Sequence, residues 1–200
     1  MTVGDTWITD ITHFPSSTLD QPVPAQVHPA AYRMGRFMGA IVASATSVPD
    51  DGPRETGLRC RRRPARRACP GYLIVQRLDE SEQIRWQCSR CDDNGLISGW
   101  HGCVWDFTQT SSSADARPRA TVYLDDDGYA LLRSAQVSMD RDTERAVMAA
   151  QHTGRGIRLS IPPDLLEDLV GAIAFEANHE ETRERQRRLD ELADLFDRAR

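Results

Sequence analysis

The feature that most constrains this chain is a set of four cysteines, Cys60, Cys69, Cys88 and Cys91, within a window of 32 residues. The last two form a CxxC pair, which lets one loop present two thiolates to a metal ion. A second pair about 20–30 residues upstream completes a tetrahedral set of sulfur ligands, for which zinc is the usual occupant. Such a closed site leaves no open position for substrate, so the pattern predicts a structural Zn²⁺ ion rather than a catalytic one.

The ligand set has alternatives. Cys60 and Cys69 are nine positions apart rather than three, so the residues between them must loop out and return. His101 or Cys103 could replace one of the four ligands. The cysteines could also pack as small hydrophobic residues without any metal. The chain has neither a His-Glu-x-x-His motif nor a His-x-Glu motif ahead of the CxxC pair, which argues against zinc catalysis.

The residues around the cysteines predict a small sheet. Segments 72–78 and 83–88 are short and rich in apolar residues, and a polar turn separates them, as in a β-hairpin. A third short strand is predicted at 95–100. A cysteine loop, a hairpin, a CxxC turn and a third strand together resemble a zinc ribbon over residues 58–105. The resemblance implies structural zinc but not one function, since zinc ribbons bind nucleic acids, dock proteins or simply stabilise a fold.

Basic residues are concentrated in the same window. Residues 59–91 contain nine arginines and three acidic residues, whereas the whole chain has a net charge of −5. Guanidinium groups bind phosphate in bidentate fashion, so a loop rich in arginine could follow a nucleic-acid backbone. Alternatively, the arginines could neutralise the zinc–thiolate centre and pair with carboxylates of the chain. The arginines predicted to bind an anion are Arg59, Arg61, Arg62, Arg63, Arg66 and Arg67.

Three tryptophans, Trp86, Trp100 and Trp105, lie close to the cysteines in the sequence. They could stack on nucleic-acid bases, or they could form the core of the small sheet.

The N-terminal region is predicted to contain one helix. Apolar residues recur at helical spacing over 30–47, and Gly35, Gly39 and Ala43 form a row of small residues that permits close packing. Before this helix, Trp7 and its apolar neighbours could anchor a short segment, and residues 15–29 are rich in proline. Residues 48–57 are interpreted as a turn-rich connection.

The C-terminal half predicts a second small domain. Strands are expected at 120–124 and 157–161, with helices after Asp125 and at 141–152 between them. A further helix opens at Pro162–Asp164, where proline is tolerated in the first turn. Its apolar face disappears over 178–188, which leaves either one long helix or two helices with a break near Asn178.

The predicted fold class is therefore α+β in two domains. Residues 1–107 comprise the N-terminal helix and the zinc-ribbon-like antiparallel sheet, and residues 108–118 form a serine-rich linker. Residues 119–200 form a strand–helix–helix–strand–helix domain that ends in a charged helix.

Composition bears on the compartment and the source. The chain starts without a signal-like segment, has no apolar run of about 20 residues and has five cysteines, which together favour reduced thiols in the cytoplasm and no membrane association. All 25 basic residues are arginine, which is typical of a GC-rich bacterial genome.

The sequence thus predicts a non-enzymatic bacterial zinc-binding protein with a regulatory or adaptor role. Its arginine-rich loop would contact an anionic partner, and its C-terminal helix would contact a protein partner or a second copy of the chain. One alternative is a small enzyme with a site between the domains, in which His101, Asp106 or His179 would act. The other is a structural component of a larger assembly.

Overall fold

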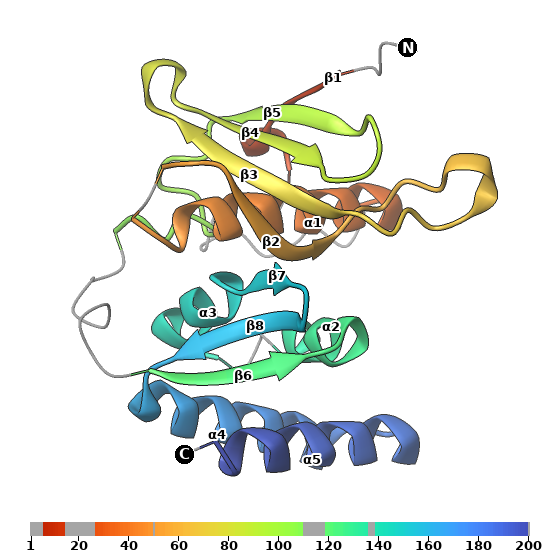
Figure 1. Cartoon of the computed structure of the whole chain (residues 1–200), viewed down its shortest axis with the longest axis vertical. Coiled ribbons are helices and arrows are strands. Elements are labelled where there is room, and N and C mark those ends of the chain that lie inside the picture. Colours follow the sequence, from red (N-terminus) through yellow and green to blue (C-terminus); the bar gives the residue numbers. More distant parts are fainter. Residues whose placement is uncertain (1–5, 15–26, 50, 110–118, 136–138, 200) are drawn as a thin grey trace. The chain divides into compact units, whose positions relative to one another are not determined.

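The protein has an α+β fold, and its chain divides into two compact units, Met1–Gln109 and Thr110–Arg200 (Figure 1). The expected boundaries of the linker stay predictions, because most of that segment lies outside the residues that the structure describes. Part of the proline-rich segment predicted at 15–29 lies outside them too. The computed structural model describes residues 6–14, 27–49, 51–109, 119–135 and 139–199.

The first unit is built on a five-stranded sheet with the order β1-β5-β4-β3-β2. The predicted hairpin and third strand are present as β3, β4 and β5. The sheet is mixed rather than purely antiparallel, because β1 pairs with β5 in the parallel direction. The strands are β1 (Thr6–Asp10), β2 (Arg54–Arg59), β3 (Tyr72–Leu78), β4 (Gln83–Cys88) and β5 (Asn94–Ser98).

Two of these strands were not expected. Strand β2 begins within the segment interpreted as a turn-rich connection, and its sequence Arg-Glu-Thr-Gly-Leu-Arg has no alternation of apolar residues. It pairs with β3 through a register shift between Glu55 and Arg59, so the irregular sequence fits an irregular edge. Strand β1 was interpreted only as an anchoring segment. Both lie at the edges of the sheet, where half of the backbone ladder is absent and the sequence pattern is weaker.

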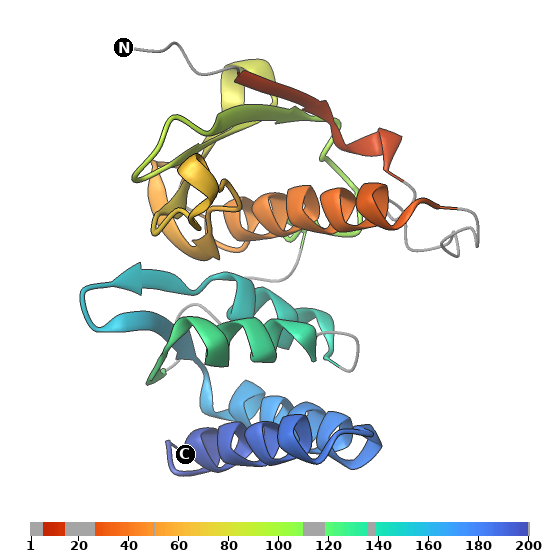
Figure 2. The ribbon, with the colours of Figure 1, turned by 90° about the vertical axis from the view of Figure 1, so that its right-hand side faces the viewer.

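Helix α1 (Pro29–Thr46) lies along one face of this sheet (Figure 2). The helix begins with proline at its first turn, where a missing N–H has no cost. Aromatic rings from the same unit pack against two glycines of its row of small residues. A Cβ atom built on Gly35 would lie 3.0 Å from the ring of Phe14, and one on Gly39 would lie 2.2 Å from the ring of Trp105.

The second unit contains a three-stranded antiparallel sheet with the order β6-β8-β7. Helices α2 and α3 pack against this sheet, and α4 and α5 pack side by side. The elements are β6 (Ala120–Leu124), α2 (Asp126–Ser134), α3 (Arg141–Met148), β7 (Gln151–Thr153), β8 (Gly156–Ile161), α4 (Pro163–His179) and α5 (Arg183–Asp197).

Two features of this unit differ from the expectations or decide between them. The helix predicted at 141–152 ends at Met148, because the chain turns there into the short strand β7. Two helices are present rather than one, and the break between them, at residues 180–182, lies within the polar segment 178–188. Glu180 has extended backbone angles at the end of α4, and its carboxylate accepts hydrogen bonds from the N–H and hydroxyl of Thr182 just before α5.

Candidate metal centre

The four predicted cysteines come together in the first unit, and all their sulfur atoms lie within 4.8 Å of one another. The Sγ atoms of Cys60 and Cys91 are 3.7 Å apart, and those of Cys69 and Cys88 are 3.6 Å apart. Four sulfurs at about 2.3 Å from a tetrahedral zinc ion would be separated by about 3.8 Å. The cluster therefore fits one metal ion held by four thiolates.

Strand ends and turns position the four sulfurs. Cys60 follows β2, Cys69 lies just before β3, Cys88 is the last residue of β4, and Cys91 lies in the turn between β4 and β5. Because β2, β3 and β4 are antiparallel neighbours in the sheet, the end of β2, the start of β3 and the end of β4 lie side by side. The hairpin register thus brings sequence-distant cysteines to one point.

Each sulfur accepts a hydrogen bond from the backbone N–H two residues further along the chain. For Cys60, Cys69 and Cys88 the N···S distances are 3.3–3.4 Å. At Cys91 burial raises the pKa, and the corresponding bond from the N–H of Asp93 acts against that rise. Such bonds stabilise negative charge on sulfur and orient metal ligands, so the turns are already shaped for thiolates. The donors are Arg62, Gly71, Arg90 and Asp93.

The thiols differ in their proton affinity. Burial raises the pKa of Cys60, and it raises that of Cys91 to about 11. Burial also acts to raise the pKa of Cys69, but the N–H of Gly71 and the neighbouring thiols outweigh it, so this pKa is lowered. A metal cation in the cluster would stabilise the thiolate forms of Cys60 and Cys91. Binding of the metal would therefore release the protons of these two thiols.

The long insert between the first two cysteines, residues 61–68, loops out and returns as the spacing requires. The N–H of Cys60 donates to the carbonyl of Gly71 at 2.9 Å, and the N–H of Cys69 donates to the carbonyl of Arg62 at 2.9 Å. These two bonds close the base of a loop whose tip is a 3₁₀ turn at Pro64–Arg66. We call residues 59–69 the arginine loop.

Three arginines of this loop are engaged by the fold. The guanidinium of Arg59 lies 5.0 Å from the centre of the Tyr72 ring, and that of Arg61 lies 4.8 Å from the centre of the Phe37 ring. Arg62 is the one that neutralises nearby charge. Its guanidinium lies 3.6 Å from the carboxylate of Asp92 and 3.8 Å from that of Asp93.

The remaining three, Arg63, Arg66 and Arg67, are exposed and have no ion pair among the residues that the structure describes. The intramolecular interpretation therefore fits Arg62, whereas contact with an anionic partner stays a prediction. Arg62 compensates carboxylates beside the sulfurs, and Arg63, Arg66 and Arg67 are displayed to solvent.

The three tryptophans near the cysteines serve mainly as core. Trp86 and Trp100 are only 1 % and 4 % exposed, and the indole of Trp100 donates a hydrogen bond to the carbonyl of Glu82. Trp105 is half-buried over Gly39. The exposed tryptophan is Trp7 on β1, which is 47 % exposed and which the sequence marked only as an anchor.

The other residues considered in the sequence lie outside the four-sulfur cluster. The ring of His101 stacks on Trp100, with ring centres 3.6 Å apart. The Asp106 carboxylate accepts hydrogen bonds from Gly102 and Thr108 and so stabilises its own loop. In the second unit, Nδ1 of His179 lies 2.8 Å from the carbonyl of Phe175. Cys103 is buried.

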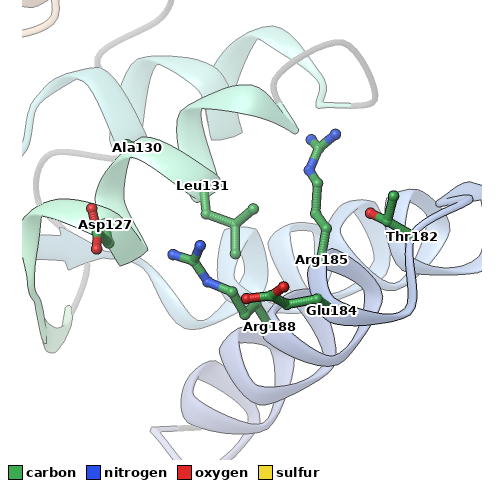
Figure 3. A pocket seen from close by; sticks show the side chains of 7 residues that line it. All are labelled: Asp127, Ala130, Leu131, Thr182, Glu184, Arg185 and Arg188. Atoms are coloured by element: carbon green, nitrogen blue, oxygen red, sulfur yellow. The ribbon is translucent and has the colours of Figure 1, made fainter.

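A cavity of about 410 Å³ lies between α2 and α5 in the second unit (Figure 3). Arg185 within it pairs with Glu180 at 2.9 Å. Two acidic and two basic residues line this cavity, so its lining has no excess charge that would favour anions or cations, and we assign no ligand to it. The lining residues are Asp127, Ala130, Leu131, Thr182, Glu184, Arg185 and Arg188.

No protein family, curated protein or solved structure matches the chain. Among the described residues, no helix combines the length and the apolar character needed to cross a bilayer.

Proposed function

We propose that this protein is a non-enzymatic bacterial zinc protein with a regulatory or adaptor role, in which a structural Zn²⁺ ion fixes the arginine loop for contact with an anionic partner. The observation that carries the proposal is the cluster of four cysteine sulfurs, each with an N–H donor two residues further on. Four thiolates fill the coordination sphere of zinc, so the metal would hold the loop rather than act on a substrate.

The position of the loop links the metal to the partner. Cys60 and Cys69 lie at its two ends. One metal ion would therefore fix both ends of the loop, where β2 ends and β3 begins. Arg63, Arg66 and Arg67 are exposed between them. A loop held at both ends loses less conformational entropy on binding than a free one, which favours binding of an anionic surface. Nucleic acid is the anionic partner we propose.

The second unit supports a protein contact less directly. Helix α5 buries Leu189, Leu192 and Phe196, and its exposed side carries charges such as the Arg187–Glu191 pair at 2.9 Å. A protein partner, or a second copy of the chain, would therefore meet a charged surface at α5. The alternatives of a small enzyme with a site between the domains and of a component of a larger assembly stay predictions.

The proposal is tested by the salt dependence of binding to single-stranded nucleic acid. The triple variant R63A/R66A/R67A should bind more weakly to every sequence, and the slope of log K against log[salt] should fall in magnitude by about 2. A control that removes the same charge from the second unit, R183A/R188A/R198A, should keep the wild-type slope. Absent or salt-independent binding by the zinc-loaded wild type would refute the nucleic-acid partner.

A further inference from the structure

A cavity of about 220 Å³ lies beside the metal centre in the first unit. Residues of β1, β4, α1 and the arginine loop line it. Three charged residues, Arg61, Arg62 and Asp93, contribute to its lining. The rest of the lining is aromatic or thioether in character and consists of Trp7, Met34, Phe37, Met38 and Trp86.

The aromatic rings give this cavity a defined geometry. The rings of Phe37 and Trp86 meet edge to face, with centres 6.3 Å apart and planes at 83°. Trp7, at the edge strand, is half-exposed, so part of its indole is available to a ligand. Met38 and Trp86 are the buried residues among these apolar lining side chains. A flat ring entering the cavity would thus meet aromatic and sulfur-containing side chains.

One residue of the lining, Trp86, has a buried polar atom without a partner in the described part of the chain. The indole Nε1 of Trp86 is buried and has no hydrogen-bond partner among the described residues. It lies over Gly95, whose absent side chain leaves room for the ring: a Cβ atom there would lie 2.6 Å from this nitrogen. A buried donor without an acceptor is unfavourable, so a ring nitrogen or carbonyl of a ligand would stabilise the complex if the indole turned toward it.

The charge around the cavity selects an anionic ligand. Arg61 and Arg62 are exposed residues of the lining, and the exposed Arg63, Arg66 and Arg67 follow along the same loop. Asp93 is the acidic residue of the lining. It is buried, and its carboxylate lies 3.8 Å from the guanidinium of Arg62, which compensates its charge. A ligand with a flat polar ring and a chain of negative charges would match both the cavity and the loop.

We propose that this cavity takes one unstacked base of a single-stranded nucleic acid whose phosphates lie along the arginine loop. The inference rests on the proposed function and names the chemistry of its partner. A base in a duplex would have to leave the stack first, so single strands are the expected ligand. Trp7 would stack on the base, and the loop arginines would contact phosphates on either side of it. An apolar protein side chain in the cavity, without acidic neighbours, would leave the arginines unmatched.

The experiment compares two labelled single-stranded DNA oligonucleotides by fluorescence anisotropy with the zinc-loaded full chain. One has a mixed sequence, and the other has the same number of phosphates but abasic sugars. The wild type should bind the first roughly tenfold more tightly, because each stacked base contributes about that much. An RNA of the same mixed sequence, measured in parallel, shows which sugar is preferred.

Variants test whether the preference for the oligonucleotide with bases arises in the cavity. Trp7→Ala should bind both oligonucleotides with equal affinity, and Trp7→Phe should recover much of the preference because a stacking ring is restored. Phe175→Ala removes an exposed aromatic ring from the second unit and should leave the preference unchanged. Zinc content and the circular dichroism spectrum of each variant show that it is folded.

The outcomes separate this inference from the proposed function. Equal wild-type affinity for both oligonucleotides, with binding still weakened in R63A/R66A/R67A, overturns the base site and leaves the arginine loop as an anion-binding surface. A preference for bases that persists in Trp7→Ala also overturns the site. If neither oligonucleotide binds in a manner that depends on the arginines, both proposals are wrong.

Discussion

A Cβ atom on Gly71 would lie 2.5 Å from the sulfur of Cys88, although the two residues are 17 positions apart along the chain. The backbone N–H of the same glycine donates to the sulfur of Cys69. Gly71 therefore lies between two of the proposed ligands, and only a residue without a side chain leaves the four sulfurs at metal-binding separation.

Gly71→Ala should consequently impair metal binding without removing a ligand. The added methyl group would force Cys88 or the turn after Cys69 to move, so we expect zinc affinity to fall at least tenfold, which is ~1.4 kcal/mol. Competition with a chromogenic chelator measures this affinity. Gly171→Ala is the matched control, since its Cβ would enter open space. Equal zinc affinity in both variants would contradict the close approach.

Zinc affinity should rise with pH. The raised pKa values of Cys60 and of Cys91, the latter about 11, keep both thiols protonated at neutral pH in the metal-free protein. Zinc binds thiolates, so binding releases at least these two protons, and the affinity is lost as the pH falls. From about pH 6 to about pH 8, log K should increase by about 2 or more per pH unit. Affinity independent of pH would show that the ligands are not these thiols.

Gly39→Ala should destabilise the first unit by about 1–3 kcal/mol, because the methyl group would overlap the ring of Trp105. The same substitution in a Trp105→Ala background should cost much less, since the ring is gone and alanine favours the helix. Urea denaturation of the four proteins gives this double-mutant cycle. Additive effects would show that the helix and the ring do not contact one another.

Asp140 should stabilise helix α3. Its carboxylate accepts hydrogen bonds from Asp142 and Thr143 at the start of the helix. Partial burial acts to raise the pKa of Asp140, but these bonds outweigh it and hold the pKa below its usual value. Asp140→Ala should cost ~1 kcal/mol at neutral pH. Because the lowered pKa belongs to the folded state, this contribution is present above the unfolded pKa of about 3.9 and disappears as the pH falls further.

Urea denaturation at neutral and at acidic pH measures this contribution. Asp190→Ala, an exposed change on α5, serves as the control and should alter stability little. A cost for Asp140→Ala that does not decrease at acidic pH would mean that the carboxylate is not the stabilising group.

The sequence predicted the fold best where local pattern and tertiary structure agree. In β4, Ile84 and Trp86 are buried while Arg85 and Gln87 are exposed, and this alternation was visible in the chain. The four cysteines were found because a metal site demands few residue types at limited spacings. Strand β2 was missed because its backbone pairs with β3 while its side chains show no period.

The surroundings of the sulfurs could not be predicted in the same way. The pairing of Arg62 with Asp93 depends on how the arginine loop returns to the sheet, which no local pattern encodes. The sequence does not show which tryptophans are exposed. Trp86 lies in the internal strand β4 and is buried, whereas Trp7 lies in the edge strand β1 and is half-exposed.

The measurement that tests the central claim most directly is the metal content of the purified wild type, Cys60→Ser and Cys103→Ala, determined by elemental analysis. The account predicts one zinc per chain in the wild type and in Cys103→Ala, whose sulfur lies outside the cluster, and its loss in Cys60→Ser. No metal in the wild type, zinc retained by Cys60→Ser, or zinc lost from Cys103→Ala would contradict it.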